Sequence, residues 1–192
     1  MTDVSDWDLV AQARSGQLEA FELLVKRYQA PLIGFCRRMV GSTQDAEEIA
    51  QESFVRVYRF LDRLRPDAKF STVLFGIARN LALNALRDAS RRGRFVTQSL
   101  SRDDQSELSI EDTAHTPDRV ARRGEIAALL EKALADLSPE HREIIVLREL
   151  HGLEYEAIAE IVKCRIGTVK SRLARAREQL RVRVIELGGD LI

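Results

Sequence analysis

The sequence lacks the residue clusters that build metal centres and disulfide frameworks. Its 192 residues include only two cysteines, Cys36 and Cys164, which stand far apart in the chain. A structural zinc site or a disulfide framework needs ligands grouped at short spacing. We therefore expect two ordinary apolar thiols, no metal site and no cofactor. The three histidines are equally dispersed, at His115, His141 and His151.

Aromatic residues, prolines and long apolar runs are also scarce. Aromatics make up 6% of the chain and prolines number four. The helix formers Ala, Leu, Glu and Arg dominate, so an all-α fold is predicted. No apolar run approaches the roughly 18 residues of a membrane span, and the first residues do not resemble a secretory signal. We expect a soluble cytoplasmic protein without membrane insertion.

One stretch, residues 94–116, is almost empty of large apolar side chains. Such a segment buries too little surface to offset its conformational entropy. We interpret it as a flexible acidic linker between two small helical domains, residues 1–93 and 117–192. Its acidic side chains are Asp103, Asp104, Glu107, Glu111 and Asp112.

Capping signals predict where helices begin and end. Ser5 and Ser42 each precede an aspartate by three positions, as in a capping box. Pro31 lies within a run of helical spacing over residues 18–39 and should kink or break that helix. Further helices are predicted over residues 42–61, 71–92, 138–151, 154–162 and 167–185, and from an N-cap at Thr116 onward.

The most basic segment is residues 163–180, with six Lys or Arg residues and one acid, Glu178, in a chain of zero net charge. A short amphipathic helix and the turn "KCRI" precede it, which is typical of a helix-turn-helix whose second helix enters the DNA major groove. An apolar seam would face the core, at Val169, Leu173, Ala176 and Leu180. Base and phosphate contacts are expected from residues away from that seam, namely Arg165, Thr168, Lys170, Ser171, Arg172 and Arg175.

A basic amphipathic helix has other uses. It can be a solvated face, or it can bind a partner or a membrane surface. A solvated helix usually balances its cations with acids four residues away, and this one has only Glu178. The preceding helix and turn therefore favour DNA binding.

Three segments in order resemble the bacterial extracytoplasmic-function (ECF) sigma factors. They are "DAEEIAQESFVRVYRFL" at residues 45–61, "FSTVLFGIARNLALNALR" at 70–87 and "LSPEHREIIVLRELHGLEYEAIAEIVKCRIGTVKSRLARAREQL" at 137–180. The resemblance implies two helical domains that join core RNA polymerase and direct it to promoters. It also implies control by an anti-sigma factor.

The resemblance assigns a role to each segment. The first would dock on the clamp helices of the polymerase beta-prime subunit, and the last domain would meet the beta flap. The docking residues would be Asp45, Glu47, Glu48, Gln51 and Glu52, although a plain solvated acidic face is the alternative. The loop at residues 62–69 and the helix after it would open and read the minus-ten element, through Arg63, Arg65, Lys69, Arg79, Asn80, Asn84, Arg87 and Arg91. The basic helix would read the minus-thirty-five element.

The chain departs from the family pattern at two positions. Val73 stands where relatives commonly carry tryptophan, and Arg165 where many have proline. The acidic linker would thread a polymerase channel toward the active site, or it would be a plain tether.

Two rival readings are open. An ordinary helix-turn-helix regulator with a helical sensor or dimerisation domain would share the last domain. An all-helical carboxylate-bridged metal enzyme would need Glu-x-x-His pairs, which the sequence lacks.

Overall fold

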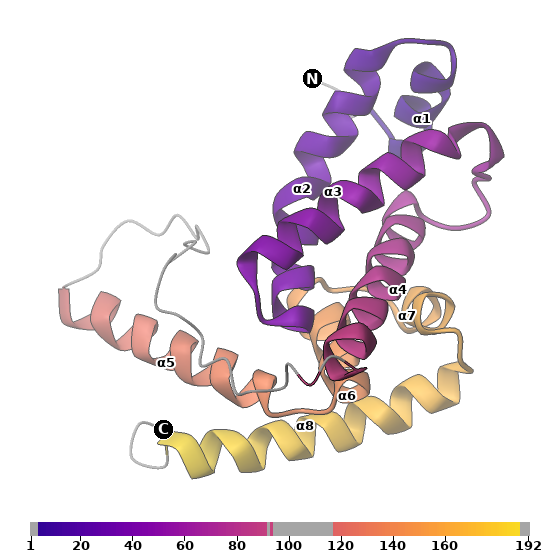
Figure 1. Cartoon of the computed structure of the whole chain (residues 1–192). Coiled ribbons are helices and arrows are strands. Elements are labelled where there is room, and N and C mark those ends of the chain that lie inside the picture. The colour runs from indigo at the N-terminus through magenta and orange to yellow at the C-terminus, as the bar shows by residue number, and fades with distance from the viewer. Residues whose placement is uncertain (1–3, 92, 94–116, 189–192) are drawn as a thin grey trace.

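The computed structural model describes residues 4–91, 93 and 117–188, and every regular element among them is a helix (Figure 1). The all-α prediction is confirmed. The helices α1 to α4 form an N-terminal unit, and α5 to α8 form a second unit beneath it in Figure 1. The predicted linker and the cap at Thr116 lie outside the described residues.

The N-terminal unit contains α1 (Asp6–Arg14), α2 (Leu18–Val40), α3 (Thr43–Arg59) and α4 (Phe70–Arg91), with a single 3₁₀ turn, η1 (Leu61–Arg63). Both predicted serine caps are present. The hydroxyls of Ser5 and Ser42 accept hydrogen bonds from the backbone N–H three residues on, each at 3.2 Å. Gly41 ends α2 in the left-handed region with a φ of 78°, which glycine adopts without strain.

Of the kink or break predicted at Pro31, the break does not occur: α2 runs through this residue to Val40. Pro31 itself is exposed. Leu24 on one side of it, and Leu32 and Phe35 on the other, are buried in one core. Burial of a large apolar side chain contributes about 1.5–3 kcal/mol, so several of them outweigh the local cost of the proline.

The C-terminal unit contains α5 (Pro117–Ala135), α6 (Pro139–Ile145), α7 (Tyr155–Val162) and α8 (Ile166–Gly188). A π turn, η2 (Val146–Leu150), continues α6 toward the predicted end near residue 151. Ser138 caps α6 as predicted, accepting from the N–H of His141 at 3.4 Å. Lys163 ends α7 in the left-handed conformation, with a φ of 55°, and so starts the tight turn into α8.

The two units pack on each other through α4 and α7, and through α2 with α5 and α6. Figure 1 shows α7 beside α4. Among the described residues, no helix is long and apolar enough to cross a bilayer. Within the same part of the chain, no cluster of His, Cys, Asp and Glu is arranged to hold a metal ion.

Candidate nucleic-acid and partner interfaces

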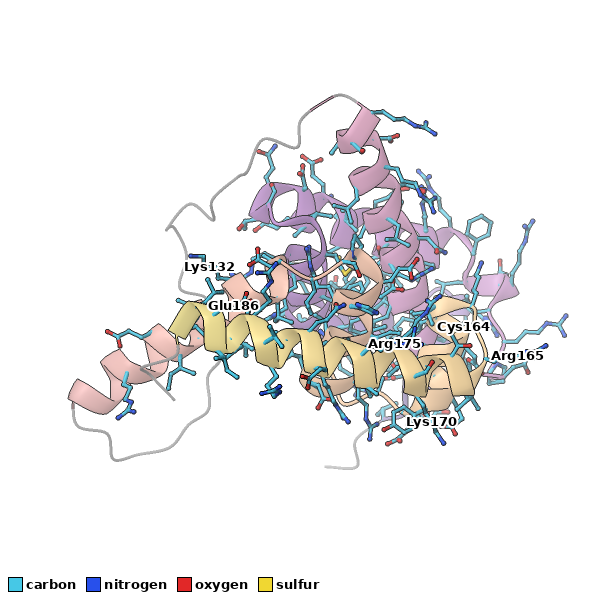
Figure 2. All side chains as sticks on the ribbon, turned by 90° about the horizontal axis from the view of Figure 1, so that it is seen from below. Lys132, Cys164, Arg165, Lys170, Arg175 and Glu186 are labelled. Carbon is cyan, nitrogen blue, oxygen red and sulfur yellow. The ribbon has the colours of Figure 1, made fainter. Side chains whose placement is uncertain are left out.

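The helix-turn-helix presents its predicted DNA-reading residues on the surface. The seam residues Val169, Leu173 and Ala176 are buried, and Leu180 is half-buried against the core. On the outer side, Arg165, Lys170, Ser171 and Arg175 are exposed, while Thr168 and Arg172 are half-buried. Figure 2 looks onto α8, with Arg165 and Lys170 near the start of the helix and Arg175 farther along it.

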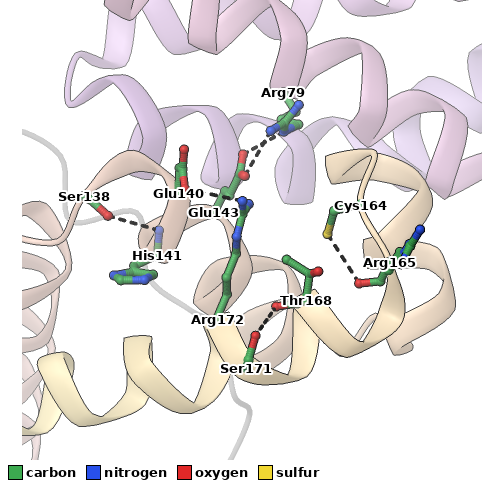
Figure 3. Close-up of polar contacts among 10 residues, drawn as sticks. All are labelled: Arg79, Ser138, Glu140, His141, Glu143, Cys164, Arg165, Thr168, Ser171 and Arg172. Atoms are coloured by element: carbon green, nitrogen blue, oxygen red, sulfur yellow. Dashed lines mark hydrogen bonds and ion pairs between the residues drawn. The ribbon is translucent and has the colours of Figure 1, made fainter.

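Contacts within the domain position several of these side chains. Arg172 lies 3.7 Å from the Glu140 carboxylate of α6, and the Ser171 hydroxyl donates to the Thr168 carbonyl at 3.1 Å (Figure 3). The Lys170 ammonium lies 5.7 Å from the centre of the Tyr155 ring. A cation at this distance is attracted by the ring face. These loose contacts orient the cations without burying them, so a DNA phosphate can replace the carboxylate.

Arg177 has a firmer partner. Its Nε and Nη2 donate to the Glu149 carboxylate at 2.9 and 2.6 Å, and these hydrogen bonds raise the pKa of the guanidinium further. The pair ties α8 to the π turn η2. The spacing of residues along α8 gives no sign of this partner, which lies 28 positions away in the sequence.

The predicted minus-ten residues lie on the loop after η1 and along α4. All of them except Arg79 are exposed, and these are Arg63, Arg65, Lys69, Asn80, Asn84, Arg87 and Arg91. The opposite side of α4 is buried through Phe70, Leu74 and Phe75. This surface therefore combines cations and amides that suit a single DNA strand, whose binding depends on phosphate contacts and stacking.

Unlike the other predicted minus-ten residues, Arg79 is mostly buried. Its guanidinium donates to both carboxylate oxygens of Glu143, at 2.7 and 3.0 Å, and only 13% of its side chain is exposed (Figure 3). In this structure it therefore contacts the second domain and is not free to meet DNA.

The acidic face of α3 borders an apolar groove that the sequence did not predict. Asp45, Glu47, Glu48 and Gln51 are exposed, and Glu52 pairs with Arg56 at 2.7 Å. The groove between α2 and α3 has a volume of about 730 Å³. Glu47 and Gln51 line it together with the apolar residues Phe21, Val25, Ile33, Ala50, Phe54, Val55 and Tyr58. An apolar floor with a charged rim fits an amphipathic partner helix.

One signal for this groove was present in the sequence. The apolar residues of α2 form a stripe with helical spacing, yet Phe21 and Val25 are only half-buried. A stripe wider than one packed face indicates a second contact surface. The thiol of Cys36, in contrast, is fully buried, and burial raises its pKa to about 12.

Comparisons with known proteins agree with this arrangement. Residues 24–92 match the family model "Sigma-70 region 2", and residues 127–180 match "Sigma-70, region 4". The chain is 37% identical over 182 residues to the RNA polymerase sigma-H factor of Pseudomonas aeruginosa, covering 94% of each chain. It is 36% identical over 179 residues to the ECF RNA polymerase sigma-E factor of Escherichia coli K12, covering 92% of this chain and 93% of that one.

Solved structures give the same result. The structure of CnrH in complex with the cytosolic domain of CnrY matches with a TM-score of 0.67 and 28% identity, covering 96% of this chain and 98% of that one. The sigma factor RpoE of Bartonella quintana, in complex with the anti-sigma factor NepR, matches with a TM-score of 0.67 and 26% identity, over 85% and 96% of the chains.

The fold and its helix-turn-helix thus define a transcription initiation factor of the sigma-70 class, with regions 2 and 4. Within that class the chain belongs to the ECF family of RNA polymerase sigma factors. It is an alternative sigma factor, which joins core RNA polymerase and directs it to promoters.

Proposed function

We propose a division of labour among three surfaces of this sigma factor. The α3 face and its groove bind core polymerase, α4 and the loop before it open and read the minus-ten element, and α8 reads the minus-thirty-five element. One observation carries the proposal: α8 buries Val169, Leu173 and Ala176 and exposes its basic side. This is the geometry that a helix needs to enter the major groove.

The α3 groove supplies both attraction and shape for polymerase. The exposed carboxylates of Glu47 and Glu48 can pair with basic residues of the beta-prime clamp helices, and the apolar floor excludes water from the contact. The beta flap would meet the C-terminal domain, as the family resemblance implies.

Along α4, the amide of Asn80 is exposed and is our first candidate for a base contact. Opening the duplex and extruding a base costs a few kcal/mol, which stacking and phosphate contacts offset. The acidic linker at residues 94–116 would enter a polymerase channel built for nucleic acid, or act as a tether, and it stays a prediction.

We expect neither DNA-binding surface to bind promoter DNA tightly on its own. Each domain is small, and the chain has no net charge to attract DNA over a distance. Polymerase would hold the two readers at a fixed separation, so that the second contact becomes intramolecular. Such a linkage raises overall affinity by about 10²–10⁴-fold.

The relatives also support control by an anti-sigma factor. The RpoE structure contains the anti-sigma factor NepR, and the CnrH structure contains the cytosolic domain of CnrY. The groove between α2 and α3 is a suitable site for such a partner. The protein would act in the cytoplasm beside polymerase, by binding and not by catalysing a reaction of its own.

Removal of a base-reading arginine tests the assignment of α8. In Arg175→Ala or Arg172→Ala, we expect initiation at a cognate promoter to weaken by about 1–3 kcal/mol, or roughly 5- to 150-fold, with relaxed preference at the contacted base pair. Run-off transcription with core polymerase on promoter variants measures both effects. Arg181→Ala removes a cation of the same helix that is paired with Glu178, and it should initiate normally. Wild-type activity in both α8 variants would show that another face enters the groove.

A further inference from the structure

The two domains are joined by an ion pair between α4 and α6. Glu143 of α6 is fully buried, and within the part of the chain that the structure describes it forms its ion pair with Arg79 of α4. The pair is bidentate, with both oxygens and two guanidinium nitrogens engaged. A buried carboxylate without its cation is costly, so Glu143 can stay buried in the docked arrangement only with Arg79 opposite it.

A second arginine extends the junction at the end of α2. Arg142 donates from Nη1 to the backbone carbonyls of Arg38 and Met39, at 3.2 and 3.0 Å. Its Nε donates to the carbonyl of Leu134, in its own domain, at 3.0 Å. The last carbonyls of a helix lack partners within the helix, so a cation there is favourable. Arg38 in turn pairs with Glu131 of α5 at 2.6 Å.

Aromatic rings also pack against each other across this junction. The His151 ring, at the end of η2, lies 4.9 Å from the Phe75 ring and 6.2 Å from the Phe35 ring, measured between centroids. Both phenylalanines belong to the N-terminal domain and are buried. The junction thus combines charge, hydrogen bonds and packing, as a specific interface does.

The docked domain covers Arg79 and lies against one side of the minus-ten surface, whose other predicted residues stay exposed. A groove of about 250 Å³ lies between α4 and α7. Val73 and Asn80 line it from α4, and Glu160 and Lys163 line it from the helix-turn-helix. A DNA strand that reached Asn80 here would meet the Glu160 carboxylate and the body of α7. The small Val73 leaves room for α7, where a tryptophan would fill this space.

With its two domains packed in this way, the chain cannot contact both promoter elements at once. Their names place them roughly 25 base pairs apart, which is about 85 Å along straight DNA at 3.4 Å per pair. In the structure, α4 and the helix-turn-helix are in direct contact.

We propose that the free chain closes on itself, with the Arg79–Glu143 pair as the latch, and that promoter reading requires this latch to open. Arg79 would then have two partners in turn, Glu143 in the closed chain and DNA in the open one. The inference rests on the proposed function, since it assigns the minus-ten element to α4. When the competent state is a small fraction of the molecules, apparent affinity falls by that fraction.

The test measures the distance between the domains in the full-length chain without polymerase. Spin labels at Lys26→Cys and Glu156→Cys, both exposed, report that distance in a Cys164→Ser background that removes the accessible native thiol. We expect one short, narrow distance distribution for the intact latch, and a longer, broader one in Glu143→Ala. Glu149→Ala removes the same charge from an ion pair inside the second domain and should leave the distance unchanged.

A second readout uses a fluorescein-labelled 15-nucleotide DNA single strand of random sequence. Glu143→Ala should bind it at least about fivefold more tightly than Glu149→Ala, because in more molecules Arg79 is released and α7 moves away from Asn80. Val73→Trp opens the same junction by bulk alone and should act in the same direction. A long, broad distance in the chain with the intact latch would overturn the proposal, whatever the variants do. So would a lengthened distance with unchanged binding of the strand.

The latch and the proposed function fail in different ways. Holoenzyme containing Glu143→Ala should transcribe as well as wild type, because polymerase already separates the domains. Loss of run-off transcription by the wild-type chain would refute the proposed function and leave the distance measurement intact.

Discussion

Replacing Glu47 and Glu48 together by lysine should weaken the association with core RNA polymerase by at least about 100-fold. Both carboxylates are exposed on α3, and Glu47 lines the apolar groove. Close charge pairs across an interface contribute about 1.5–7 kcal/mol, and reversed charges repel the partner that the native ones attract. Titration of labelled core enzyme by fluorescence anisotropy measures the change directly.

A matched control distinguishes an effect of the α3 face from an effect of the total charge of the protein. Glu178 and Glu186 of α8 are also exposed, and each pairs only with an arginine three residues away among the ion pairs of the described chain. Reversal of these two changes the total charge by the same amount, so polymerase affinity should stay within about threefold of wild type. Equal losses in both double variants would mean that α3 is an ordinary solvated face.

Acidification should destabilise the protein through His151. Burial among aromatic rings, with a smaller contribution from nearby Arg38, lowers the pKa of His151 from 6.5 to about 4. Its Nε2 has no hydrogen-bond partner in the described structure. Below pH 6.5 His151 is protonated in the unfolded chain but stays neutral in the folded chain. The free energy of unfolding therefore falls with pH until the pH reaches about 4. At pH 5 the loss should be about 2 kcal/mol relative to pH 7.5.

Comparison with His151→Phe isolates this contribution from that of the carboxylates. Urea unfolding at pH 7.5 and pH 5 should give a smaller loss for the variant than for wild type, and His141→Gln, on the surface side of α6, should behave as wild type. Parallel losses in all three proteins would mean that His151 is accessible to protons in the folded state.

Local chemistry made most of the fold predictable. The serine caps, the left-handed Gly41 and the proline at the start of α6 act within a few residues, so sequence spacing reveals them. The exception at Pro31 depends on tertiary burial around α2, which outweighs the local preference. The π turn between α6 and the loop at His151 has no comparable local signal.

The sequence predicted which side of each candidate helix is exposed, but it did not predict contacts between residues that are far apart in the chain. Helical spacing correctly separated the buried seam of α8 from its exposed basic side. It could not show that Arg79 pairs with Glu143, because these residues lie 64 positions apart and meet only through domain packing. The apolar groove likewise lies between α2 and α3, so the stripe along α2 indicates only one of its two walls.

Run-off transcription with purified core RNA polymerase over a promoter library tests the central claim most directly. Transcripts should form only when the chain is present, and they should start from promoters that share two elements at one fixed spacing. Initiation that is indifferent to that spacing, or no initiation above core enzyme alone, would contradict it.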